Sequence, residues 1–318
     1  MSADATTETA SPRWCATLSQ QRGEGLAGTA LHVRRLLLIE HDGPWPFHAL
    51  EAEGLDPEVV GSLVDATRAA GARTLLIRRP HREGRRADVR CWAVVDVAAG
   101  LLTWGSWREA DDLLAARDAL AADSWDEQAD RSAPGWGADP VVLVCTHGRH
   151  DACCAVRGRP LATALADRHG ETVWECSHVG GDRFAGNVVV VPDGTFYGGL
   201  DEPADAVRVV GSHLRGAVDT SHLRGSAALP PAAQAVAVEL VRRHGPAAPR
   251  AVLAHRIETL ETGERARWRV RLECAAPLPA RAVAVVAREP AGDAAFLTCQ
   301  APGPVVPQRY RVEDLRED

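Results

Sequence analysis

The fold is decided by three segments: CTHGRHDACCAVRGRP (145–160), WECSHVGGDRFAGN (174–187) and VVVVPDG (188–194). Apolar runs that are typical of strands lead into the first two segments, so cysteines and a histidine stand where strands are expected to end. Thiolates and imidazoles are soft ligands for zinc, iron and iron–sulfur clusters. The pattern therefore predicts a metal or iron–sulfur site at one end of a sheet.

Around this stretch the elements follow a β-α-β-β-β-α order. The last two strands of that unit form a hairpin across Asp193-Gly194, which is a strong turn signal. Strands are predicted at 140–145, 172–176, 187–192 and 195–200, and helices at 154–168 and 202–216. The same order is predicted upstream, with strands at 33–41, 74–80, 91–97 and 101–107 and helices at 55–70 and 111–120.

A βαβ unit followed by a ββα unit is the thioredoxin-like order. The predicted fold class is therefore α/β, with two thioredoxin-like β-α-β-β-β-α lobes, related by duplication, and a C-terminal α+β appendage. The predicted boundaries are an N-terminal tail and loop at 1–32, a first lobe without metal-type residues at 33–123, a polar linker at 124–139, a second lobe at 140–217, and the appendage at 218–318. In the appendage we expect a helix at 230–245 and strands at 252–260, 265–274, 281–289 and 295–300.

Composition narrows the class of protein. The 318 residues are 46% hydrophobic and 25% charged with a net charge of −7, which is typical of a soluble globular protein and argues against a general nucleic-acid or membrane-surface binder. All 36 basic residues are arginines, so mechanisms that need a lysine are excluded. No secretory signal or membrane-length apolar run is visible, and we expect a cytoplasmic protein. Eight cysteines in a reducing compartment favour metal binding or catalysis over disulfides.

The candidate ligands follow predicted strands. Cys145 ends a strand, and Cys154 lies at or near the start of the next helix, where backbone N–H groups favour a thiolate. His178 follows the strand that ends at Cys176, and Asp182 comes four positions later. Residues two apart on a strand face the same side, so Cys176 is an alternative ligand. Cys153 is a second alternative if it, rather than its neighbour, faces the metal.

Glycines and polar residues surround these ligands. Gly180 and Gly181 let the backbone turn tightly and approach an anionic centre, where their N–H groups can donate to sulfides. Arg183 and Asn187 are expected as further donors around the ligands. The remaining cysteines are expected to be structural or core residues, namely Cys15, in a loop without clear periodicity, and Cys91, Cys274 and Cys299, in strand-like contexts.

These motifs resemble the sucrase/ferredoxin-like family of thioredoxin-fold [2Fe–2S] proteins. The resemblance rests on CTHGR, CCAVRGRP, WECSHVGGDRFAGN and the VVVxPDG hairpin, and it covers about 135–215. It implies that 140–217 is a thioredoxin-like ferredoxin lobe whose cluster is held by two cysteines and by the histidines of an H-x-G-G-H motif. By this resemblance, Cys145 and Cys154 match the cysteines and His178 matches the first histidine.

The second histidine position is occupied by Asp182 in this chain. An aspartate is a harder, anionic ligand, which lowers the reduction potential and makes a cluster more labile. Three possibilities stay open: His178 with Asp182, His178 with Cys176, or no cluster.

The resemblance implies electron transfer by a [2Fe–2S] cluster, which makes the chain a redox carrier rather than a stand-alone enzyme. A thiol–disulfide redox protein using Cys145, Cys153 or Cys154 and a zinc-stabilised or cluster-less binding module are the alternatives. Neither the C-x-x-C of the former nor the short knuckle spacings of the latter are present. GEGLAG (23–28) does not fit a dinucleotide fingerprint, so we expect a separate electron donor, such as a flavin reductase, and an acceptor that the sequence does not identify.

Overall fold

The fold is that of a computed structural model, which describes residues 14–81, 88–122 and 140–318. The predicted linker at 124–139 and residues 1–13 of the N-terminal segment lie outside the described residues. The predicted α/β class is confirmed, because helices alternate with the strands of a mixed sheet. None of the described helices combines the length and the apolar character needed to cross a membrane.

The first half of the main sheet begins with a parallel pair of strands joined by a helix. Asp56 caps that helix by accepting hydrogen bonds from the N–H groups of Glu58 and Val59 at 2.8 and 3.1 Å, and Pro57 occupies its first turn. The elements are β1 (Arg35–Glu40), α2 (Pro57–Ala69), β2 (Ala72–Arg78), β3 (Arg90–Asp96), β4 (Leu101–Trp107) and α3 (Leu114–Ala121). Strand β3 lies antiparallel to β1, and β4 lies antiparallel to β3.

The second half repeats this element order. Its elements are β5 (Val141–Cys145), α4 (Ala152–His169), β6 (Val173–Cys176), β7 (Val188–Val191), β8 (Thr195–Tyr197) and α5 (Pro203–Leu214). Strands β5 and β6 are parallel, whereas β7 and β8 run antiparallel to their neighbours. One further short strand, β9 (Leu223–Ser226), pairs with β8 and was not anticipated from the sequence.

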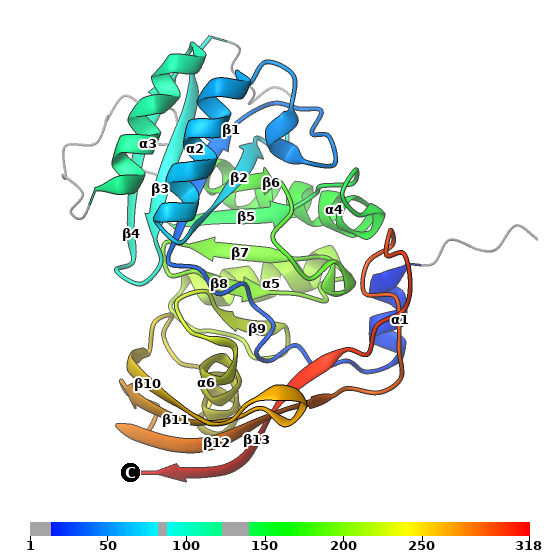
Figure 1. Cartoon of the computed structure of the whole chain (residues 1–318), viewed down its shortest axis with the longest axis vertical. Coiled ribbons are helices and arrows are strands. Elements are labelled where there is room, and N and C mark those ends of the chain that lie inside the picture. Colours follow the sequence, from blue (N-terminus) through cyan, green and yellow to red (C-terminus); the bar gives the residue numbers. More distant parts are fainter. Residues whose placement is uncertain (1–13, 82–87, 123–139) are drawn as a thin grey trace, which may run out of the picture.

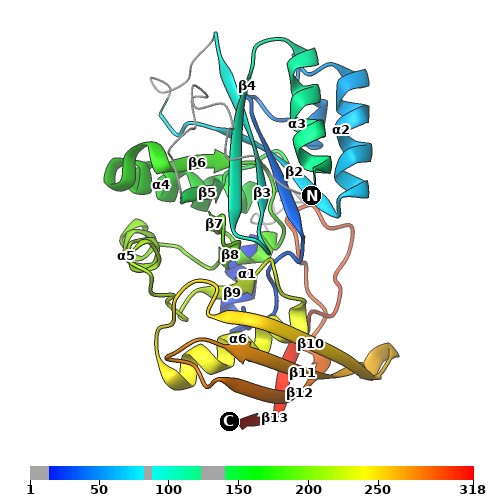
Figure 2. The ribbon, with the colours of Figure 1, turned by 90° about the vertical axis from the view of Figure 1, so that its left-hand side faces the viewer.

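The two halves share one sheet of order β4-β3-β1-β2-β6-β5-β7-β8-β9 (Figure 1). They meet where β2 and β6 pair antiparallel, with Ile77 opposite Cys176 and Arg78 opposite Glu175. Counted outward from this junction, both halves have the same strand order, while the two-lobe duplication stays a prediction. Helices α2 and α3 pack against the first half of this sheet and α4 and α5 against the second, and Figure 2 shows the two pairs at opposite sides of the view.

The C-terminal part is a helix packed on a separate four-stranded antiparallel sheet. Helix α6 (Pro231–His244) covers β10 (Val252–Glu261), β11 (Arg267–Cys274), β12 (Arg281–Pro290) and β13 (Gln308–Glu317). Apolar residues of β11 alternate, so Val270 and Leu272 are buried against the helix while their neighbours are exposed. The predicted helix and the first three predicted strands are thus present.

Two sequence expectations were wrong. The predicted strand at 295–300 is not regular, since only an isolated bridge joins Ala295 to Val305, and β13 is the fourth strand instead. The expected loop after Trp14 contains α1 (Cys15–Gln21), which at seven residues is too short to show periodicity. Figure 1 shows the segment between β12 and β13 leaving its own sheet to reach α1.

Candidate metal centre

The ends of two parallel strands bring the candidate ligands together. Cys145 is the last residue of β5, and Cys154 lies in the first turn of α4. His178 follows β6 by two residues, and Asp182 opens a short 3-10 turn. Since β5 and β6 are adjacent and parallel, the loops that leave their carboxyl ends meet at one edge of the sheet.

The start of α4 is fixed by a helix cap at Asp151 and by close packing of the helix against the end of β5. Asp151 caps the helix by accepting a hydrogen bond from the N–H of Cys153 at 2.9 Å. Gly158 lies so near the end of β5 that a Cβ atom there would come within 2.1 Å of the Cys145 carbonyl oxygen. Only a glycine lets the helix pass this close to the strand.

The turn between His178 and Asp182 depends on two glycines and an amide. Gly180 and Gly181 have φ angles of +85° and +78°, which strongly favour glycine. The Asn187 side-chain amide donates a hydrogen bond to the Gly181 carbonyl oxygen at 2.9 Å. Asn187 therefore supports the turn that carries the candidate ligands, as a residue around the centre was expected to do.

Four predicted ligands gather in this arrangement. The donor atoms of Cys145, Cys154 and His178 all lie within 4.8 Å of one another. The Cys154 thiol donates to Asp182 Oδ1 at 3.4 Å, and Nδ1 of His178 lies 2.9 Å from the same oxygen. The donor atoms of His150, His178 and Asp182 also lie within 4.8 Å of one another. The structure thus pairs His178 with Asp182, and their role as ligands stays a prediction.

Proximity shifts the proton affinities of these groups. Cys145 is buried, yet the neighbouring Cys154 thiol holds its pKa well below the usual value. The pKa of Cys154 is raised instead, by Cys145 and by burial. Burial alone would lower the pKa of His178, but Asp182 and Cys145 outweigh it and raise that pKa to about 9. Burial opposes ionisation of Asp182, yet its pKa is lowered by His178. Without a metal, these neighbours therefore favour the thiolate of Cys145, the imidazolium of His178 and the carboxylate of Asp182.

One ring atom of His178 fits a metal ligand. Nδ1 is buried and makes no hydrogen bond of acceptable geometry among the described residues, although Asp182 Oδ1 is near. A buried nitrogen whose ion pair lacks good hydrogen-bond geometry is incompletely satisfied, and a bound metal ion would satisfy it. The donor set of two thiols, an imidazole and a carboxylate suits zinc, iron or an iron–sulfur cluster.

A buried arginine and a half-buried arginine lie beside the centre. Arg224, in β9, is 1% exposed and donates hydrogen bonds to the Gly180 carbonyl and Asn187 Oδ1 at 2.9 and 2.8 Å. Arg73, at the start of β2, donates to the His178 carbonyl at 3.0 Å. Burial lowers the pKa of both, for Arg224 to about 9, and the charges of Asp182 and Cys145 oppose that shift. In the part of the chain that the structure describes, neither forms an ion pair with a carboxylate. Their charge is therefore matched to an anionic centre.

Three residues proposed from the sequence lie apart from this group. Cys176 is buried in the neighbouring core and is not among the converging donors of the described chain. Cys153 faces away, toward Cys15 and Cys299. Arg183 pairs with Glu24 at 2.6 Å rather than with a residue of the centre. Cys299, expected in a core strand, is instead a half-buried residue of the irregular segment between β12 and β13.

Stacked rings connect the centre to the surface. His178 stacks on His150 with ring centroids 3.8 Å apart, and His150 stacks on Phe47 at 4.7 Å. Phe47 is 43% exposed. A pocket of about 340 Å³ opens here, and His147 also lines it. His147 is fixed as a support, because Nδ1 accepts from the His178 N–H at 3.3 Å and Nε2 contacts the Pro46 carbonyl at 2.7 Å.

A family model described as sucrase/ferredoxin-like matches residues 26–225, which is more than half of the chain. The chain belongs to the sucrase/ferredoxin-like family. No curated protein and no solved structure matches it significantly. The family match includes all four predicted ligands and Arg224, whereas Cys15 and Cys299 fall outside it.

Sequence reasoning missed both arginines and the stack of rings. Arg73 lies one position before the predicted strand at 74–80, and Arg224 was assigned to the C-terminal appendage. Neither carries a local signal, because what makes them notable is a buried or half-buried guanidinium without a carboxylate partner among the described residues. His150 is near the ligands in the sequence, but Phe47 comes from the loop between β1 and α2.

Proposed function

We propose that this family member is an electron-transfer protein that carries a [2Fe–2S] cluster at Cys145, Cys154, His178 and Asp182. The donor chemistry fits the group, and the guanidiniums of Arg73 and Arg224 balance the negative charge that thiolates and sulfides bring. When bound, such a cluster would accept and release one electron at a time. The Gly180–Asp182 turn would hold the ligands, and the surrounding core would exclude water.

The observation that carries the proposal is the stack of Phe47, His150 and His178. It leads from an exposed side chain to a candidate ligand through two ring contacts. A purely structural metal site has no need of such a connection, whereas an electron carrier needs its centre close to the surface where a partner docks.

Metal and sulfide analysis of anaerobically purified protein tests the proposal. We expect two irons and two acid-labile sulfides per chain at this site, with visible charge-transfer bands. Cys145→Ser should lose both iron and colour. Cys91→Ser is the matched control, because Cys91 is buried in β3 and belongs to none of the converging donor groups. A folded chain without iron or sulfide would contradict the proposal.

The electron donor is proposed to be a separate reductase, such as a flavin enzyme, since no dinucleotide fingerprint is present in the sequence. We expect it to dock over Phe47. Phe47→Ser should slow reduction by a ferredoxin reductase with NADPH, while iron content is unchanged. An unchanged rate would place the docking surface elsewhere.

A single zinc ion is the second candidate for this site. The donor atoms of Cys145, Cys154 and His178 converge within 4.8 Å, as one tetrahedral ion requires. Metal and sulfide analysis distinguishes zinc from a [2Fe–2S] cluster, since zinc would give one metal ion at this site, no sulfide and no colour. Thiol–disulfide exchange is disfavoured, because Cys145 and Cys154 are each only 1% exposed and a protein substrate has no access to them.

A further inference from the structure

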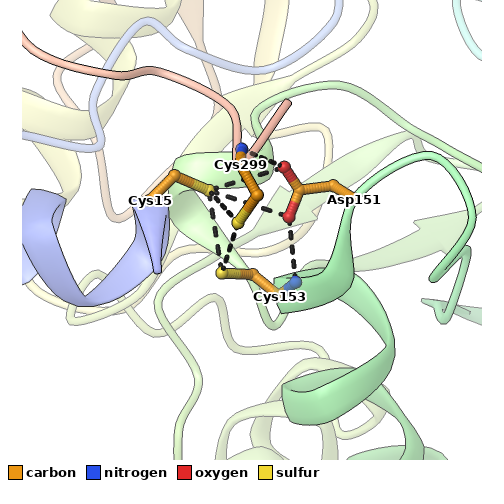
Figure 3. A group of neighbouring side chains, drawn as sticks. All are labelled: Cys15, Asp151, Cys153 and Cys299. Carbon is orange, nitrogen blue, oxygen red and sulfur yellow. Dashed lines mark hydrogen bonds between the residues drawn. The ribbon is translucent and has the colours of Figure 1, made fainter. Parts of the chain in front are cut away.

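A second group of sulfur and oxygen donors lies on the other side of the α4 start. Figure 3 shows Cys15, Cys153, Cys299 and Asp151 pointing toward one another. They come from the beginning of α1, from the start of α4 and from the irregular segment between β12 and β13. Their donor atoms all lie within 4.8 Å of one another.

The separations match one tetrahedral ion. The three sulfurs form a triangle, with 3.7 Å between Cys15 and Cys153, 3.3 Å between Cys153 and Cys299, and 3.6 Å between Cys299 and Cys15. The Asp151 oxygens lie 3.6 and 3.7 Å from Cys15 Sγ. Tetrahedral zinc, with Zn–S near 2.3 Å and Zn–O near 2.1 Å, separates its sulfurs by about 3.8 Å and places oxygen about 3.6 Å from sulfur.

The aspartate is held in a fixed orientation. Oδ1 accepts a hydrogen bond from the Cys153 N–H at 2.9 Å, and Oδ2 accepts one from the Cys299 N–H at 2.7 Å. Asp151 is 0% exposed, yet within the described residues it forms no ion pair with a basic side chain. A buried carboxylate beside three thiols lacks a cation, and a metal ion would supply it.

We propose that Cys15, Cys153, Cys299 and Asp151 bind one structural zinc ion that clips the N-terminal helix and the C-terminal segment to α4. Four protein ligands would close the coordination sphere, as in structural rather than catalytic zinc sites. Binding would displace the three thiol protons. A [2Fe–2S] cluster fits less well, because each of its irons takes only two protein ligands, whereas three sulfurs here touch one another.

This centre is distinct from the first one. Cys153 and Cys154 are consecutive, and their side chains diverge, so one helix start serves both donor groups. The second group shares no donor atom with the first. The zinc proposal therefore stands whether or not the first centre holds iron and sulfide.

Zinc content of full-length variants is the primary test. We expect one zinc per chain in Cys145→Ser, in which the first centre is disabled. The control Cys91→Ser should contain at least one zinc per chain. Cys299→Ser and Cys15→Ser, each combined with Cys145→Ser, should lose that one equivalent. Zinc that stays in both of these variants, or that is missing from Cys145→Ser, would overturn the proposal.

Cobalt substitution keeps the test decisive if a variant fails to fold. Co²⁺ added to metal-stripped Cys145→Ser should saturate at one equivalent, with d–d bands of tetrahedral cobalt and a thiolate charge-transfer band. A spectrum without thiolate bands would refute the site. So would a Cys153–Cys299 disulfide in peptide maps of protein purified under reducing, zinc-supplemented conditions.

Discussion

Asp182 is the residue at which this chain differs from the H-x-G-G-H pattern expected of a bis-histidine centre. Its carboxylate lies 2.9 Å from His178 Nδ1 and accepts from the Cys154 thiol, so it lies beside the other candidate ligands. Because a carboxylate is negatively charged, it stabilises the oxidised state of a cluster more than a neutral imidazole does.

Asp182→His should therefore raise the reduction potential of the cluster, by tens of millivolts or more. The shift follows from removing one negative charge from the iron. EPR-monitored redox titration measures it, with the exposed Asp205→His on α5 as the control. An unchanged potential would mean that Asp182 is not a ligand.

Arg224 offers a second test at the scale of one side chain. Arg224→Gln removes a buried charge and several hydrogen bonds, leaving acceptors such as the Gly180 carbonyl without donors. Unsatisfied buried acceptors cost about 1–3 kcal/mol each, so we expect the free energy of unfolding to fall by roughly 3 kcal/mol. The reduction potential should also fall. Arg208→Gln, at an exposed ion pair on α5, should cost less than about 1 kcal/mol in urea denaturation.

The pKa of His178, raised to about 9 in the metal-free chain, makes metal uptake depend on pH. Below that pH a proton must leave the ring before the metal binds, so affinity should rise about tenfold per pH unit from 7 to 9 from this group alone. Co²⁺ titrations at several pH values measure the affinity. Cobalt that binds to wild type but not to Cys145→Ser reports on the first centre. Asp182→Asn removes the carboxylate that retains the proton and should flatten the rise. A pH-independent affinity would contradict the assignment.

At the scale of elements, the approach of α4 to the end of β5 sets the position of Cys145 relative to Cys154. Gly158 makes it possible, because a Cβ there would meet the Cys145 carbonyl oxygen at 2.1 Å. Gly61, inside α2, has nothing within 4 Å of such an atom. The two glycines therefore form a matched pair in helix interiors.

Gly61→Ala should stabilise the protein by up to about 1 kcal/mol, because alanine is the better helix former. Gly158→Ala should instead destabilise it and lower the metal content, since the helix must move away from the strand. Urea denaturation and metal analysis of both variants provide the comparison. Equal stability changes would show that the helix and strand separate without cost.

Elements with strong local signals were predicted well from the sequence. The Asp193-Gly194 hairpin, the apolar strands and the amphipathic helices all lie close to where patterning placed them. The exceptions are short or depend on distant partners. Strand β9 has four residues and is defined by its pairing with β8, whereas the segment around Cys299 is apolar but is held irregularly near α1. Local sequence carries no record of such partners.

The candidate site was predicted in part for the same reason. Cys145, Cys154, His178 and Asp182 lie within 38 positions and follow strands, so their convergence was foreseeable. Cys15 and Cys299 are 284 positions apart, and no spacing rule joins them. Only the folded chain places them beside Cys153.

At the scale of the whole molecule, the irregular segment between β12 and β13 connects the C-terminal sheet with the beginning of the chain. If zinc holds it there, a chelator strong enough to remove the ion should release both α1 and residues 291–307. Hydrogen exchange measured by mass spectrometry should show lost protection in these segments, while β5 and β7 keep theirs. Cys299→Ser should reproduce the loss without chelator. Unchanged exchange after zinc removal would show that packing alone holds the segment.

The distance in sequence between Cys153 and Cys299 also has a consequence for biosynthesis. Their separation is 146 residues, which a ribosome adding about 5–20 residues per second translates in roughly 7–30 s. For most of that interval the ligands of the first centre are already made, while the second donor group lacks a sulfur. The zinc clip can therefore close only late in translation or after it, so a nascent chain can receive its first cofactor before its two ends are joined.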